Sequence, residues 1–154
     1  MIGTFFSDLL FSASATAGFG LLFHAPRRSL LPGALIGGLS YSVFHCIELL
    51  SGQSAAGALA AGLLAGFLGE YTAEKMKMPS TVFTTMGIIA TLPGFGLYNT
   101  MLLLIQGDYQ QAASVGASTM LTFGAIALAL GCSTVVFRKL RHFKSASSRP
   151  GDLR

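Results

Sequence analysis

The sequence contains few charged residues and no tryptophan. Of its 154 residues only 10% are Asp, Glu, Lys or Arg, whereas 52% are hydrophobic and the mean hydropathy is +0.64. A soluble domain has about 25% charged residues. The chain is also too short to hold a large soluble domain in addition to several membrane spans. The composition therefore predicts a membrane protein.

Metal-binding and catalytic motifs are also absent from the sequence. The two cysteines, Cys46 and Cys132, form neither a CxxC pair nor a Cys/His set with the spacing of a zinc site. We expect both to be small apolar packing residues within spans. The apolar segments hold no HExxH, GxSxG or paired-carboxylate motif, and the chain has no nucleotide-binding loop. These absences argue against an enzyme, and we predict no metal and no cofactor.

Five apolar segments have roughly the 20 residues that cross about 30 Å of hydrocarbon. We expect them to be helices, so the predicted fold class is an all-α multi-pass membrane protein. The first apolar run has no basic residue before it, which favours a span over a signal peptide. A basic tail, disordered at its end, is expected over residues 138–154. The predicted membrane domain is residues 1–137, with spans at 2–23, 30–50, 55–73, 82–105 and 112–137.

The positions of the basic residues predict how the spans are oriented. All ten lysines and arginines fall on alternate connections or on the tail, and the remaining connections have none. Positively charged loops stay on the cytoplasmic side. The N-terminus is therefore predicted outside and the C-terminus inside. The basic residues are Arg27, Arg28, Lys75, Lys77, Arg138, Lys139, Arg141, Lys144, Arg149 and Arg154.

The net charge of +4 and the isoelectric point near 9.4 do not indicate a nucleic-acid partner. The basic excess is confined to positions next to the membrane, where it determines topology and contacts anionic lipid head groups of the bilayer. Arg27 and Arg28 have a second interpretation, in which they attract an anionic substrate at the inner mouth. No nucleic acid is expected as a partner.

The predicted fourth span is interrupted near its middle by the stretch ATLPGFGLYNTM, residues 90–101. Pro93 removes a backbone donor, and Gly94 and Gly96 are poor helix formers. Unwound backbone inside a membrane must face protein or a water-filled cavity. Transporters place substrate sites at such breaks, although a proline kink that only shapes packing is the alternative. The candidate substrate-binding residues are Thr91, Pro93, Gly94, Gly96, Tyr98 and Asn99.

Three ionisable residues lie in the outer parts of the first two predicted spans, and ionisable groups inside a membrane are costly and usually face the protein interior. His45 and Glu48 are three residues apart and share a helix face, and Asp8 lies at a similar depth in the first span. Histidine titrates in the range that suits proton transfer. The three are candidates for proton coupling, and the alternative is that Asp8 and Glu48 are solvated at the outer interface.

Small residues recur at a spacing of four in the second and third predicted spans. Such pairs allow helix backbones to approach closely. We expect tight contacts there, either within the chain or against a partner. The pairs are Gly33 and Gly37, Gly38 and Ser42, and Gly62 and Gly66.

Two runs of the sequence resemble one transporter family. TAGFGLLFHAPRRSLLPGALIGGLSY, residues 16–41, is similar to its first hairpin, with a GFxxxF span end, a Pro-plus-basic loop and a glycine-rich second span. EKMKMPSTVFTTMGIIATLPGFGLYNTM, residues 74–101, is similar to its basic loop, P-x-x-V-F entry and P-G-x-x-x-Y break. The order and spacing resemble the threonine/serine exporter family, in its small-subunit type that corresponds to the C-terminal membrane half.

The resemblance implies a function in export. It implies a subunit of a secondary exporter in the bacterial cytoplasmic (inner) membrane, acting with a larger partner subunit of opposite orientation. The implied substrates are small metabolites with a carboxylate, either threonine/serine-type amino acids or dicarboxylates such as succinate. A homo-oligomer, a non-transporting structural subunit and a small channel are the alternatives that remain open.

Overall fold

The computed structural model describes residues 2–147 and places side chains for residues 5–139. Within these residues all regular structure is helical, and no strand is found. This confirms the predicted all-α fold class. The helices are α1 (Ile2–Leu22), α2 (Arg27–Ser51), α3 (Ser54–Met76), α4 (Ser80–Ile89), α5 (Gly94–Gln106) and α6 (Tyr109–Ser147).

Four of these helices, α1, α2, α3 and α6, are each long and apolar enough to cross a membrane. The short helices α4 and α5 together pass the same test as one broken span, bent by 55°. The chain therefore has four candidate spans, or five with the bent pair, which agrees with the five that the sequence predicts. The interruption of the fourth span is confirmed.

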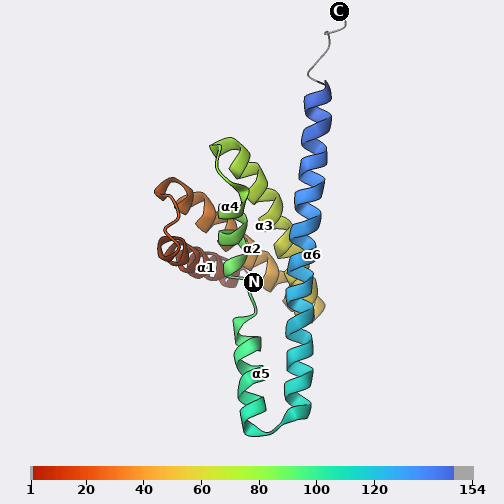
Figure 1. The fold of residues 1–154 in the computed structure, drawn as a ribbon. Helices are drawn as coiled ribbons and strands as arrows, with labels where there is room; N and C mark the ends of the chain where they lie inside the picture. The colour runs from red at the N-terminus through yellow and green to blue at the C-terminus, as the bar shows by residue number, and fades with distance from the viewer. Residues whose placement is uncertain (1, 148–154) are drawn as a thin grey trace, which may run out of the picture.

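The helices form two parts on the long helix α6, as Figure 1 shows. Helices α1 to α4 make a bundle that packs on α6 through α3. Helix α5 leaves this bundle and packs on the N-terminal half of α6, so that the two form a protruding hairpin. No residue of α5 is buried. The bundle has its own apolar core around Ile36, Ala65, Ala73 and Phe83.

The small residues at a spacing of four do lie at helix contacts within the chain. A Cβ atom added at Gly62 would lie 2.8 Å from the Cβ of Ala129, and one at Gly66 would overlap Ser133. The glycines therefore let α3 and α6 approach more closely than larger side chains would allow. Gly33 likewise leaves room for the side chain of Met86 between α2 and α4.

The connections follow from the chemistry of glycine and proline. Gly52 after α2 and Gly107 after α5 have φ angles of 67° and 82°, which is the left-handed conformation that favours glycine at helix ends. Pro26, Pro79 and Pro93 immediately precede α2, α4 and α5. A proline at such a position lacks only a donor that the helix start leaves unpaired in any case.

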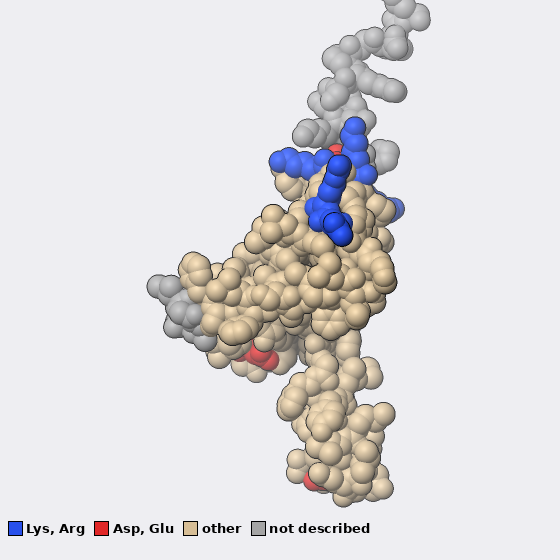
Figure 2. Space-filling view, turned by 90° about the vertical axis from the view of Figure 1, so that its left-hand side faces the viewer, with Lys and Arg blue, Asp and Glu red and all other residues tan. Residues whose placement is uncertain are grey.

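Lysine and arginine gather at one end of the molecule, away from the tip of the α5–α6 hairpin, as Figure 2 shows. We call this the basic end. Helix α6 continues past Phe137 to Ser147, so the predicted tail begins as helix. The disordered end predicted for the tail lies outside the described residues. Cys132 is exposed on α6, so the packing role predicted for it is wrong within this chain.

Candidate functional site

The break between α4 and α5 is a tight turn centred on Pro93. Its φ of −78° and ψ of 62° are those of an inverse γ-turn, and the N–H of Gly94 donates to the carbonyl of Leu92 at 2.8 Å. On the α4 side, the N–H of Thr91 donates to the carbonyl of Ile88 at 2.9 Å, which closes the last turn of that helix. The two helices are therefore separate elements with separate ends.

The start of α5 presents free backbone donors. The N–H of Leu97 donates to the carbonyl of Pro93 at 3.3 Å, whereas the N–H groups of Phe95 and Gly96 have no backbone acceptor among the described residues. Unpaired N–H groups and the positive end of the helix dipole make such a terminus favourable for an anion. The first turn of α5 can therefore hold a carboxylate.

A cavity of about 630 Å³ lies beside this turn, between the end of α2, the start of α3, the first turns of α5 and the N-terminal third of α6. Its volume is within the usual range for small-molecule sites, roughly 300–1,000 Å³. The break therefore opens onto a space that can hold a small molecule. The polar residues and break residues that line it include Glu48, Gln53, Ser54, Pro93, Gly96, Asn99, Ser118, Thr119 and Thr122.

The cavity combines one carboxylate with neutral donors and acceptors. Glu48 lies in the last turn of α2, and its carboxylate accepts a hydrogen bond from the hydroxyl of Ser54 at the start of α3. Glu48 can therefore bind an ammonium group, while the first turn of α5 can bind a carboxylate. The amide of Asn99, on the second turn of α5, supplies a further donor and acceptor.

Three hydroxyls on α6 line the same cavity, and the sequence analysis did not single them out. Ser118 and Thr119 donate to the carbonyl of Val115 at 2.9 and 2.7 Å, and Thr122 donates to the carbonyl of Ser118 at 2.9 Å. Their oxygens keep lone pairs that can accept from a ligand. The available signal was the spacing of four between Ser118 and Thr122, which places both on one helix face.

The predicted substrate-binding residues divide into two groups in the structure. Pro93, Gly96 and Asn99 line the cavity together with Glu48. Thr91, Gly94 and Tyr98 do not line it. Thr91 is 2% exposed with an unpaired hydroxyl oxygen, Tyr98 is 64% exposed, and a Cβ at Gly94 would meet nothing. A substrate role for these three stays a prediction.

The candidate proton-coupling residues are also divided. The Nδ1 atom of His45 lies 2.6 Å from Oδ2 of Asp8, which joins α2 to α1. Asp8 lines a separate cavity of about 320 Å³ with Ser12, Tyr41 and Ala90. Glu48 instead lines the cavity at the break. The structure therefore brings Asp8 and His45 together and places Glu48 with the start of α5.

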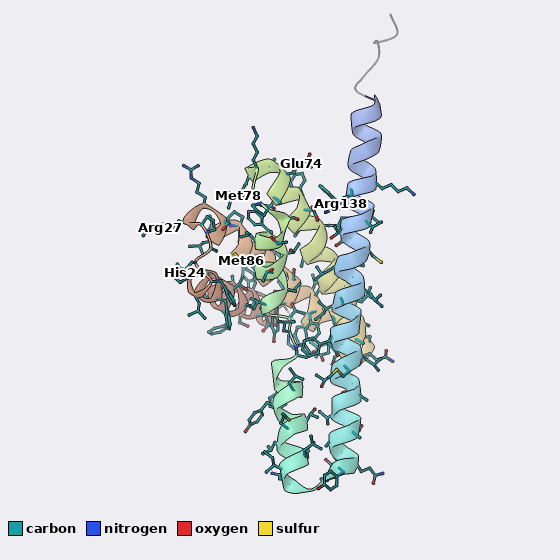
Figure 3. All side chains as sticks on the ribbon, in the orientation of Figure 1. His24, Arg27, Glu74, Met78, Met86 and Arg138 are labelled. Atoms are coloured by element: carbon teal, nitrogen blue, oxygen red, sulfur yellow. The ribbon has the colours of Figure 1, made fainter. Side chains whose placement is uncertain are left out.

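Two further cavities lie at the basic end, where Figure 3 labels residues of both. One, of about 440 Å³, is lined by Glu70, Glu74, Lys77 and Arg138 among others. The other, of about 350 Å³, is lined by His24 and Met86 among others. Glu48 lies at the opposite end of α2 from these cavities. Neither cavity therefore belongs to the cavity at the break.

Several apolar spans, one of them broken by proline beside a cavity, define a multi-pass membrane protein, and breaks of this kind occur at the substrate sites of transporters. The sequence matches the threonine/serine exporter (ThrE) family over residues 8–136, which is most of the chain. The chain therefore belongs to this family, as its two motif runs predict. Membership of a transporter family also supports the prediction that the protein is not an enzyme.

One curated relative is an uncharacterised protein from Haemophilus influenzae, which is 25% identical over 138 residues. The match covers 84% of this chain but only 46% of the relative. The chain thus spans about half of the length of that relative. No solved structure matches the chain.

Proposed function

We propose that this chain is the membrane subunit of a secondary exporter that moves small amino acids of the threonine/serine type out of the cell. The family is the starting point, and the cavity at the break supports the assignment of a substrate. The observation that carries the proposal is that Glu48, the free amides at the start of α5 and Asn99 belong to one cavity.

The chemistry of this cavity favours an amino acid over a dicarboxylate. The α-carboxylate binds at the first turn of α5, near the N–H groups of Phe95 and Gly96. The ammonium group binds the carboxylate of Glu48. A dicarboxylate such as succinate would bring a second negative charge toward Glu48, and like charges in a partly dehydrated cavity repel. The hydroxyls of α6 suit a substrate that itself has a hydroxyl group.

The break supports alternating access driven by an ion or substrate gradient. Transporters of this plan expose a site at discontinuous helices to one side and then to the other by moving one unit against another. Here the turn at Pro93 separates α4, which packs in the bundle, from α5, which packs on α6. A change in the angle between these helices would open or close the cavity. The chain has no nucleotide-binding loop that would imply ATP as the energy source.

We further propose that a larger subunit completes the exporter in the bacterial inner membrane. The relative from Haemophilus influenzae is about twice as long as the matched region, which fits a transporter with a second unit. Helix α5 has no buried residue, and Phe95, Met101 and Ile105 are 79%, 64% and 84% exposed. This apolar surface suits a second unit as well as lipid. The N-terminus lies outside and the basic end inside.

Transport measured in everted inner-membrane vesicles tests the proposal. Vesicles from cells that produce the chain with its larger partner should take up labelled L-threonine or L-serine faster than vesicles that lack the chain. An excess of unlabelled L-serine should compete, and succinate should not. Competition by succinate alone would assign the cavity to dicarboxylates. Equal uptake of labelled L-threonine and labelled L-serine by vesicles with and without the chain would reject the amino-acid exporter.

A further inference from the structure

Asp8 and His45 form a polar pair between α1 and α2. The Nδ1 and Oδ2 atoms are 2.6 Å apart, and the side chains are 32% exposed for His45 and 22% for Asp8. The pair is therefore partly enclosed but reachable. The imidazole of His45 also stacks against the ring of Tyr41, with centroids 6.4 Å apart.

The pair lies next to the break but outside the cavity proposed for substrate. Asp8 and Tyr41 line their cavity together with Ala90, which caps the end of α4 three residues before Pro93. Glu48, one turn from His45 on α2, lines the larger cavity together with residues at the start of α5. One polar site thus faces the end of α4, and the other faces the start of α5.

Few other titratable groups surround the pair. Helix α2 contributes Tyr41, Cys46 and Glu48 at this depth, and the remainder of α1 contributes none. Helix α4 has no titratable residue, and the first on α3 is Glu70, toward the basic end. Among these groups, His45 is the one that is hydrogen-bonded to Asp8. His45 is therefore the base that can take up a proton beside the Asp8 carboxylate.

We propose that the Asp8–His45 pair carries the proton that is exchanged for the exported substrate, and that Glu48 does not. This proposal rests on the proposed exporter function. With Asp8 ionised, Nδ1–H of His45 donates to its carboxylate and Nε2 keeps a lone pair. A proton from outside binds Nε2, which gives an imidazolium–carboxylate pair. The same proton leaves Nε2 on the cytoplasmic side, so one proton enters and none is created or lost.

Electrostatics connects this proton to the conformational change. Without the extra proton the pair has a net charge of −1, and with it the pair is neutral. A net charge becomes more costly when helices close around it and exclude water. Protonation therefore favours closure of the empty carrier around the end of α4, and the proton gradient drives its return to the cytoplasmic side.

Asp8→Asn tests the proposal because it removes the carboxylate. The pair is then neutral without the extra proton and has a charge of +1 with it, so protonation no longer favours closure. In everted vesicles with the larger partner, two rates of labelled L-serine transport are measured. One is uptake driven by an acidic interior, and the other is exchange for internal unlabelled L-serine without a gradient. We expect Asp8→Asn to lose the gradient-driven accumulation and its dependence on interior pH, and to retain exchange. Asp8→Glu should restore part of the gradient response.

The outcomes separate this inference from the exporter function. Gradient-driven accumulation by Asp8→Asn at the parental level overturns the inference while the exporter stands. Loss of both rates at normal membrane abundance also overturns it, because the pair would then serve structure or binding. If Asp8→Asn does not reach the membrane, His45→Gln is measured by the same two rates and the same criteria apply. Absence of both rates in the parental vesicles rejects the exporter itself.

Discussion

The carboxylate of Glu48, in the last turn of α2, accepts a hydrogen bond from the hydroxyl of Ser54, in the first turn of α3. The left-handed turn at Gly52, whose N–H donates to the carbonyl of Glu48 at 2.8 Å, brings the two residues together. This contact holds one carboxylate at the wall of the cavity beside Pro93. A two-residue connection between helices thereby positions the group proposed to bind the substrate ammonium.

Glu48→Gln should weaken substrate binding while leaving the membrane abundance of the protein unchanged. The amide keeps the shape and can still accept from Ser54, but it has no charge for the ammonium group. A hydrogen bond to a charged group contributes about 1.5–3 kcal/mol, so the apparent affinity for L-serine should fall roughly 10- to 150-fold. Concentration-dependent uptake in everted vesicles measures this fall.

Asp108→Asn is the matched control for Glu48→Gln. It makes the same acid-to-amide change outside the cavity. Asp108 accepts from the N–H of Gln111 at 3.1 Å at the start of α6, and asparagine caps helices equally well. Transport by this variant should match the parent. An equal loss in both variants would mean that the effect of Glu48→Gln is not local to the cavity.

Pro93→Ala combined with Gly94→Ala should reduce export strongly. Alanine is more favourable in a helix than proline by about 3 kcal/mol and than glycine by about 1 kcal/mol. The double variant therefore favours a helix that runs through the break and pairs the free N–H groups of α5. Membrane insertion should persist because apolarity is unchanged. Export at the parental rate by an assembled double variant would make the break a packing kink only.

Gly66→Val should destabilise the contact between α3 and α6. A Cβ at Gly66 would overlap Ser133, whereas a Cβ at Gly124 on α6 would meet nothing within 4 Å. Overpacking typically costs about 1–3 kcal/mol. The thermal unfolding midpoint of the purified protein in detergent should fall for Gly66→Val and change less for Gly124→Val. Equal midpoints for the two variants would contradict the packing of α3 on α6.

External labelling tests the orientation of the chain. In a background with Cys46 and Cys132 replaced by alanine, Asp108→Cys should react with an impermeant thiol reagent added to intact cells. Ser145→Cys should react only after the membrane is permeabilised. This pattern is expected because the lysines and arginines all fall on one side. The reverse pattern would place the basic end outside.

Reconstitution without a partner tests the requirement for a second unit. Liposomes that contain only this chain should show no efflux of L-serine, because midplane sites of this transporter plan are shared between two units. Addition of the larger subunit should restore efflux. Efflux by the chain alone would show that it forms a complete carrier, for example as a homo-oligomer.

Much of the architecture could be predicted from local patterns. Apolar length set the number of spans, and helix-breaking chemistry at Pro93 and Gly94 set the position of the break. Glycines such as Gly62 and Gly66 marked close helix contacts, but the pattern could not identify Ala129 and Ser133 on α6 as the neighbours. Partners across helices depend on packing angles that the sequence spacing within one helix does not encode.

The sequence by itself determined the membrane class, the helical fold, the broken span and the ionisable residues that are costly to place in lipid. It grouped Asp8, His45 and Glu48 because they share a depth. Only the tertiary structure decided that Asp8 pairs with His45, whereas Glu48 joins Gly96, Asn99 and the α6 hydroxyls. The physical reason is that depth follows from position along a helix, but contact between helices follows from their rotation and crossing, which packing of the whole bundle sets.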